Sequence, residues 1–146
     1  MSEEQTARLF ELADLILAVG RHIAASKESE TGTPLHGAIM RYIDRHPGTT
    51  AGAAAEATQL ISSNFSRAVR GLEKAGLVRR EVDQHDARRV HLYPTEKAQE
   101  NLERLRVIWS SMLEETVADL DEIDATISTL RNIETRLVSR TRGRTR

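Results

Sequence analysis

The hydrophobic pattern of this chain departs from helical spacing in one stretch, and that stretch limits the folds open to it. Up to Lys74, apolar residues recur at the three- and four-residue spacing of amphipathic helices. Beyond Gly76, the segments LVRREV and RVHLY are short, β-branched and loosely alternating, which is typical of strands. The polar stretch DQHDAR separates them, so the pattern predicts a β-hairpin with a loop longer than a tight turn. A fold made only of helices is therefore excluded.

Local signals place a short helix and a second helix directly before the hairpin. The breaker His46-Pro47-Gly48 ends a helix that begins near Leu35. Thr49 or Thr50 can cap a short, Ala-rich helix over roughly 51–57. After a turn near 59–61, the next helix runs to about 75, and Gly76 is the natural residue to end it. A short helix, a tight turn and a second helix form a helix-turn-helix candidate, and the hairpin makes it winged.

Long amphipathic helices occupy the two ends of the chain. The first carries apolar residues from Leu9 to Ile23. The fifth is capped by Pro94-Thr95 and carries residues up to Leu120, and the sixth can be capped by Asp121. One small domain cannot easily bury all these stripes, so we expect them to pair with a second copy of the chain. The predicted fold class is mainly α with a small β-wing. Dimerisation helices are expected over 1–34 and 95–140, a winged helix-turn-helix lobe over 35–94, and a disordered basic tail over 141–146.

The formal net charge of −1 hides an uneven distribution. Residues 64–91 contain seven Lys or Arg against four acids, and residues 136–146 contain five Arg and no acid. A local basic footprint is what phosphate binding needs, and it matters more than the total charge.

Several classes of protein are excluded by what the sequence lacks. The chain has no Cys, which rules out disulfides, Cys-based zinc sites and thiol redox sensing. Its five His residues have no metal-ligand spacing, and no nucleophile–base pair, P-loop or glycine-rich cofactor fingerprint is present. We therefore expect no enzyme activity, no metal and no cofactor. No apolar run approaches a membrane span, and the N-terminus is acidic where a signal peptide would be basic, so a cytoplasmic protein without a membrane partner is expected.

The helix before the hairpin carries the best candidates for reading double-stranded DNA. In a helix-turn-helix the N-terminal residues of the second helix lie nearest the base edges. Here they are short hydrogen-bonding side chains followed by two arginines on one face: Ser62, Ser63, Asn64, Ser66, Arg67 and Arg70. Asn pairs bidentately with adenine, Ser serves either base, and Arg reaches phosphates or a guanine edge. The alternatives are that Ser62 and Ser63 only cap the helix and that the arginines form a solvated face.

The stretches SNFSRAVRGLEKAGLVRRE and DQHDARRVHLYPTEKA resemble the MarR (multiple antibiotic resistance regulator) family of winged-helix transcription factors. The detailed match covers roughly 35–105. Gln59 stands where the family commonly has a turn Gly, and Ile61 where it has a capping Ser. The resemblance implies a homodimer, joined through the first, fifth and sixth helices, that binds a pseudo-palindromic operator, most often as a repressor.

The family's wing motif falls on Asp86 and Arg88. The resemblance implies that Arg88 enters the minor groove and that Asp86 orients it. A narrow minor groove attracts an inserted Arg, and a neighbouring carboxylate can fix a guanidinium bidentately. Arg89 adds to the basic tip. The alternatives are an ordinary salt bridge within the loop and two arginines that serve solubility.

Release of DNA by a small, anionic or aromatic effector is also implied by the resemblance. Its pocket would lie between the first, second and fifth helices, with His22, Met40, Arg41 and Trp109 as candidate residues. The alternatives are that Trp109 belongs to the core and that His22 is a polar surface or interface residue.

Two other functions remain compatible with these residues. The winged helix could bind an acidic protein partner, or the chain could bind DNA without sequence preference through its basic segments. A DNA reader is expected to lose affinity steeply with salt because it contacts several phosphates.

Overall fold

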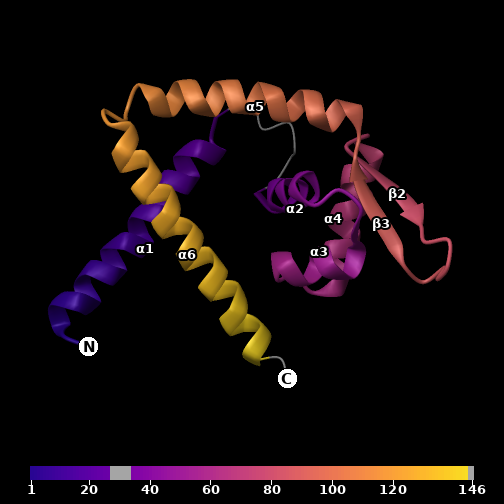
Figure 1. Ribbon diagram of the computed structural model, residues 1–146, viewed down its shortest axis with the longest axis horizontal. Helices are drawn as coiled ribbons and strands as arrows, with labels where there is room; N and C mark the ends of the chain where they lie inside the picture. The colour runs from indigo at the N-terminus through magenta and orange to yellow at the C-terminus, as the bar shows by residue number, and fades with distance from the viewer. Residues whose placement is uncertain (27–33, 145–146) are drawn as a thin grey trace.

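The computed structural model describes residues 1–26 and 34–144, and Figure 1 shows its elements in chain order. The bounds are α1 (Glu3–Ala24), α2 (Pro34–Arg45), β1 (Thr49–Thr50), α3 (Ala51–Thr58), α4 (Ser62–Lys74), β2 (Val78–Val82), β3 (Val90–Pro94), α5 (Glu96–Glu114) and α6 (Leu120–Arg144). The predicted class, mainly helical with a small antiparallel wing, is confirmed. Within the described ranges, no helix is long and apolar enough to cross a membrane.

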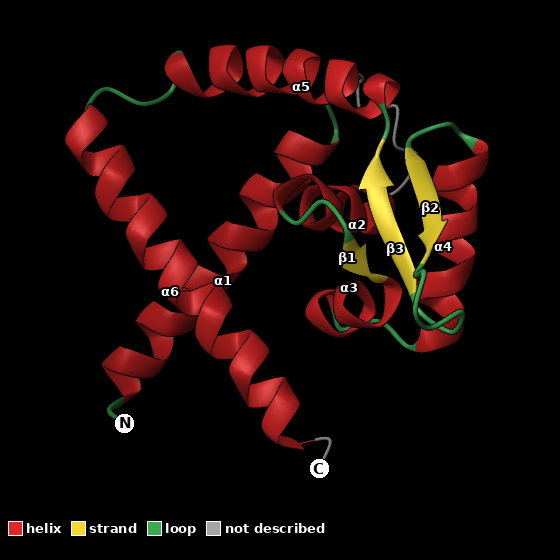
Figure 2. Ribbon diagram, turned by 45° about the vertical axis from the view of Figure 1, so that its right-hand side comes forward, coloured by secondary structure: helices red, strands yellow, loops and turns green. Residues whose placement is uncertain are grey.

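A compact lobe is formed by α2, α3 and α4 against the sheet (Figure 2). The strand order is β1-β3-β2, with both pairings antiparallel. Leu92 lies in the central strand, where its Cα pairs with Thr49 on one side and Arg80 on the other. Its side chain is completely buried, together with Ile39 and Ile43 of α2 and residues of α4. The core therefore fixes α4 and the hairpin on one small scaffold.

The helix ends follow the predicted local signals. Thr50 and Thr95 cap α3 and α5, because their hydroxyls accept the amides of the third residue in each helix. Gly76 follows α4 with a φ of 75°, the left-handed conformation that glycine adopts most readily. The connection between the first two helices lies largely outside the described residues, and Pro34 begins α2 at the position where proline is favoured.

Four features differ from the sequence predictions. The strand β1 is not predicted, because two residues carry no periodicity. The fifth helix was expected to reach Leu120 but ends at Glu114, because the chain turns after Leu113: its carbonyl accepts both the hydroxyl and the amide of Thr116. The Asp119 carboxylate then accepts the Asp121 amide at the start of α6, so the predicted cap at Asp121 is also wrong. The sixth helix continues to Arg144, into the predicted tail, which fits the high helix propensity of Arg.

The long helices α1 and α6 lie away from this lobe. They cross one another in both views, and α5 runs from the end of the sheet to the start of α6 (Figures 1 and 2). No residue of α1 is buried, although its side chains include Phe10 at 74% exposure and Leu17 at 63%. Along α6, Leu137 is 54% exposed. A helix with an apolar stripe gains most of its stability by packing that stripe, and within one chain much of these stripes remains uncovered.

Candidate nucleic-acid interface

Helix α4 separates its side chains cleanly into two faces. Phe65, Ala68, Val69 and Leu72 are buried in the core of the lobe, as the sequence predicted. The six candidate DNA-binding residues on α4 are all exposed: Ser62, Ser63, Asn64, Ser66, Arg67 and Arg70. In the described part of the chain their side chains form no hydrogen bond or ion pair. The core therefore anchors α4 by one face and leaves the other available to a partner.

The N-terminus of α4 is left open to an acceptor. Its N-cap is Ile61, whose backbone (φ −64°, ψ 144°) has the extended geometry of the other caps but whose side chain accepts no hydrogen bond. The amides of the first helical turn therefore lack the acceptor that Thr50 and Thr95 give to α3 and α5. The reading of Ser62 and Ser63 as mere caps is wrong, because both lie inside the helix. Free amides at a positive helix end favour an anion such as phosphate.

The turn between α3 and α4 depends on Gln59. This residue has a φ of 58°, in the left-handed region that non-glycine residues rarely adopt. Its amide donates to the Glu56 carbonyl at 3.2 Å, and the Leu60 amide donates to the Ala55 carbonyl at 3.3 Å. These bonds end α3 and direct the chain into α4 within three residues.

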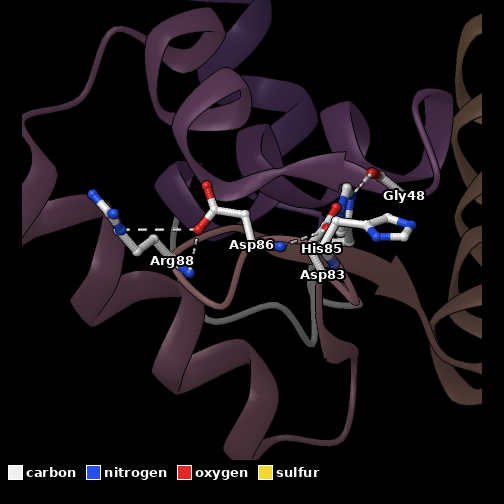
Figure 3. A network of polar contacts seen from close by, with 6 residues as sticks. Gly48, Asp83, His85, Asp86 and Arg88 are labelled. Carbon is white, nitrogen blue, oxygen red and sulfur yellow. Dashed lines mark hydrogen bonds and ion pairs between the residues drawn. The ribbon is translucent and has the colours of Figure 1, made fainter.

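The wing loop presents Arg88 to solvent, with its side chain 96% exposed. The Asp86 carboxylate accepts the backbone amide of Arg88 at 3.0 Å, while the guanidinium Nε lies 3.9 Å from the same oxygen (Figure 3). The expected bidentate clamp on the guanidinium is therefore not formed. Asp86 instead shapes the backbone on which Arg88 stands, because a two-residue turn brings that amide closer than the long side chain. Arg89 is also exposed, and its carbonyl accepts the Asp83 amide at 2.9 Å.

A polar network that is not predicted from the sequence ties this loop to the rest of the lobe. His91 Nε2 lies 2.7 Å from Asp83 Oδ2, and His91 Nδ1 lies 2.8 Å from the Gly48 carbonyl. The hydrogen bond from His91, with those from the amides of His85 and Asp86, lowers the pKa of Asp83 to about 2. The hydrogen bonds to Asp83 and then to Gly48 raise the pKa of His91. The only local signal for this network was that His91, on a predicted strand, follows Asp83 by eight residues. The contact with Gly48 could not be inferred, because Gly48 is too distant in the sequence.

The end of α4 is joined directly to the start of α5. The Thr95 hydroxyl donates to the Gly76 carbonyl at 2.5 Å, and the Thr95 amide donates to the Leu77 carbonyl at 3.2 Å. Lys97 Nζ donates to the Ala75 carbonyl at 2.9 Å, so a cation lies at the negative C-terminal end of α4. These three bonds hold the residues that directly follow α4 against the start of α5.

The four residues predicted to bind an effector lie in different surroundings. His22 and Arg41 are exposed, Met40 is part of the core at 6% exposure, and Trp109 is half-buried with its Nε1 lacking an acceptor among the described residues. Although Arg41 is exposed to solvent, the surrounding protein partly desolvates its guanidinium; this desolvation, followed by the nearby Arg45, lowers the pKa of Arg41, and Glu134 of α6 opposes the shift.

A groove of about 560 Å³ lies between the end of α2 and the first half of α5, and none of these four residues lines it. Its charged lining is mainly acidic: Asp44, Glu96, Glu100 and Glu103, with Arg106 as the one base. Burial raises the pKa of Asp44, and Arg106 opposes that shift. Such a lining does not suit an anionic effector. Within the described residues, no group of three or more His, Asp and Glu side chains is placed to hold a metal ion.

Three helices, a three-stranded sheet with a projecting loop, and long helices at both ends define a winged helix-turn-helix protein. Residues 33–89 match the model of the MarR family, so the family resemblance predicted from the sequence is confirmed over this lobe. Among curated proteins, none matches the chain.

Solved structures share the fold along most of the chain. MarR is 23% identical, with a TM-score of 0.67 over 90% of this chain and 98% of that one. Staphylococcus aureus MepR in its DNA-binding conformation is 24% identical, with a TM-score of 0.68 over 88% and 98%. The PcaV regulator of Streptomyces coelicolor, in complex with its natural ligand, is 22% identical, with a TM-score of 0.65 over 84% and 88%. At these identities the likeness establishes the fold.

Proposed function

We propose that this protein is a homodimeric, sequence-specific regulator of transcription that binds double-stranded DNA. The observation that carries the proposal is the open N-terminal turn of α4. Its amides lack a side-chain cap, and its exposed Ser, Asn and Arg side chains have no partner in the described chain. Short polar side chains let a helix approach base edges closely, and uncapped amides suit a flanking phosphate. The same lobe carries Arg88, almost fully exposed at the tip of the wing.

In this proposal α4 enters the major groove and the wing lies over the adjacent minor groove. Asn64, Ser63 and Ser66 are placed to read base edges, while Arg67 and Arg70 reach phosphates or a guanine edge. Arg88 is the minor-groove residue, and Arg89 adds a phosphate contact. An S. aureus MepR variant has been solved bound to an oligodeoxyribonucleotide, with a TM-score of 0.58 to this chain, which supports DNA as the ligand.

The second copy of the chain is proposed from the long terminal helices. α1 buries no residue in the single chain, and large apolar side chains are exposed on α1, α5 and α6. Pairing of these helices with those of a second copy would remove that surface from water and place two α4 helices on one face of the dimer. A two-fold axis then implies a pseudo-palindromic operator with half-sites about 34–36 Å apart.

Repression, release by a small molecule and action in the cytoplasm complete the proposal. PcaV has been solved with its natural ligand, which supports a small-molecule effector for this chain. Trp109 is the only Trp, and its buried Nε1 has no acceptor in the described chain, so its fluorescence can report binding in a screen of aromatic acids.

The test is selection of random-sequence duplex DNA by the purified protein at moderate salt, with sequencing of the bound pool. An enriched inverted repeat, with half-sites one helical turn apart, is the expected result. A bound pool without an enriched motif would refute sequence-specific reading and leave non-specific phosphate binding. No bound pool, with capture by an acidic protein partner, would make the lobe a protein-interaction module.

A further inference from the structure

His91 connects three segments of the lobe that are separate in the sequence. It lies in the central strand, where its Cα pairs with Thr50 of β1 and with Glu81 of β2. Its ring bridges the Gly48 carbonyl, just before β1, and the Asp83 carboxylate, at the start of the wing loop, at 2.8 and 2.7 Å. About three-quarters of both side chains is buried, with 26% of His91 and 22% of Asp83 exposed. The ring therefore ties the helix-turn-helix to the wing.

Both partners of this ring are hydrogen-bond acceptors. A backbone carbonyl cannot donate, and neither can an ionised carboxylate. A neutral imidazole has one N–H, so it can satisfy one of them and leaves the other facing a lone pair. Only the imidazolium donates to both at once. Because the pKa of Asp83 is held near 2 by its hydrogen bonds, that carboxylate stays ionised around neutral pH.

The same carboxylate organises the wing loop beyond it. Asp83 Oδ1 accepts the amides of His85 at 2.8 Å and Asp86 at 3.1 Å. Asp86 in turn accepts the amide of Arg88 at 3.0 Å (Figure 3). An unbroken series of hydrogen bonds thus runs from Gly48 through His91 and Asp83 to the backbone of Arg88.

The charged surroundings of the ring favour the cation. Asp83 faces it from the end of β2, and Glu81 is its register partner on β2, although Glu81 is paired with Arg79. Arg89 opposes the charge from the end of the loop. The turn before β1 contributes the Gly48 carbonyl and contains His46, whose ring stacks on Tyr42.

We propose that His91 is a positioning residue for DNA binding, whose protonated ring fixes the wing loop against the helix-turn-helix and makes DNA affinity depend on pH. The inference rests on the proposed function, since the readout is duplex binding. While the ring is cationic, Arg88 and α4 are held in one spatial relation. When the ring loses its proton, one of the two bonds is lost and the wing is free to shift, so the contacts of Arg88 and α4 no longer form together.

The direction of the pKa shift of His91 determines whether DNA affinity rises or falls with pH, and over which pH range. An unperturbed His titrates near 6.5, and the hydrogen bonds to Asp83 and Gly48 raise the pKa of His91 above that value. The bridge is therefore complete below about pH 6.5 and is lost as pH rises through the higher folded-state value. Affinity for DNA is expected to fall over that interval, about three- to tenfold for one charge-assisted hydrogen bond.

The experiment measures binding of a fixed random-sequence duplex pool at constant ionic strength, from about pH 6 to about pH 9. It compares the full-length protein with His91→Gln and with His85→Gln. The latter is the matched control: His85 lies in the same loop, its side chain is exposed, and only its backbone amide joins the network. The expected result is affinity that falls with pH in the wild type and in His85→Gln. In His91→Gln affinity should be nearly independent of pH, at the level of the wild type at high pH.

A wild-type measurement covers the case in which His91→Gln folds poorly. Nitrogen NMR of the His91 ring should show that both nitrogens remain protonated above pH 6.5. A ring that is neutral just above that pH, or three proteins with the same pH dependence, would overturn the inference and leave DNA binding intact. Absence of duplex binding at every pH in all three proteins would instead overturn the proposed function, and the inference with it.

Discussion

Replacing Ile61 by Ser would give α4 the side-chain acceptor that its N-terminus lacks. The backbone of Ile61 already has cap geometry, with φ −64° and ψ 144° against −71° and 150° for Thr50, so a hydroxyl there needs no rearrangement. Ile61 is 67% exposed, so truncation removes little packing. Ile61→Ala removes the same apolar surface without adding an acceptor. The difference between the two variants therefore reports the cap alone.

A Ser N-cap stabilises a helix by about 1 kcal/mol relative to Ala, within a range of about 0.5–2 kcal/mol. Ile61→Ser should thus exceed Ile61→Ala by that amount in the free energy of unfolding, measured by urea denaturation at equal protein concentration. DNA binding should change in the opposite direction. If a phosphate takes the same amides, the new cap must open before DNA binds, which costs about 1 kcal/mol or about fivefold in Kd.

The pair of measurements separates stability from recognition. Ile61→Ser should be the more stable variant and the weaker DNA binder of the two. Equal stability would show that the first turn of α4 is already satisfied. Greater stability with equal or tighter DNA binding would refute the idea that these amides receive a phosphate.

Three further substitutions test the proposed DNA interface and the proposed dimer interface. Asn64→Ala should reduce discrimination between an enriched duplex and random DNA by about 1–3 kcal/mol in competition binding, and equal weakening on both would show that Asn64 touches only the backbone. Arg88→Ala should weaken duplex binding and lower the slope of log K against log salt by about one, with the dimer still folded by circular dichroism; unchanged affinity would show that Arg88 and the wing do not contribute to DNA binding. Leu9→Asp, at a side chain 55% exposed in the single chain, should shift sedimentation from dimer to monomer while the lobe stays folded, and an unchanged dimer would exclude this part of α1 from the interface.

The helices of the lobe were predictable because their signals are local. Thr50, Thr95 and Gly76 act on residues within one turn, and the structure uses them as the sequence indicated. The exposed and buried faces of α4 were predictable for the same reason, since the period of 3.6 residues per turn determines which side chains share a face. The end of α5 was not, because apolar spacing continues past Glu114 although the backbone turns there.

The wing illustrates what the sequence could not supply. The nearness of Asp86 and Arg88 was predictable from their spacing, but not which atom of Arg88 the carboxylate accepts. The His91 bridge to Gly48 spans 43 positions and exists only because β1 pairs with β3. The missing side-chain cap of α4 could be suspected because Ile61 has no hydrogen-bond acceptor in its side chain. Only the fold shows that this end of α4 is exposed to solvent.

The joint between α4 and α5 gives the molecule a mechanical property. At about 1.5 Å per residue, the 19 residues of α5 form a rod of about 28 Å, fastened at one end by Thr95 and Lys97 to the residues that directly follow α4. A tilt of this rod by about 10° would carry its far end about 5 Å, more than the rise of roughly 3.4 Å per base pair along the DNA axis. In a two-fold assembly built on α1 and α6, a small rotation of α5 would therefore change the distance between the two α4 helices by more than the rise of one base pair.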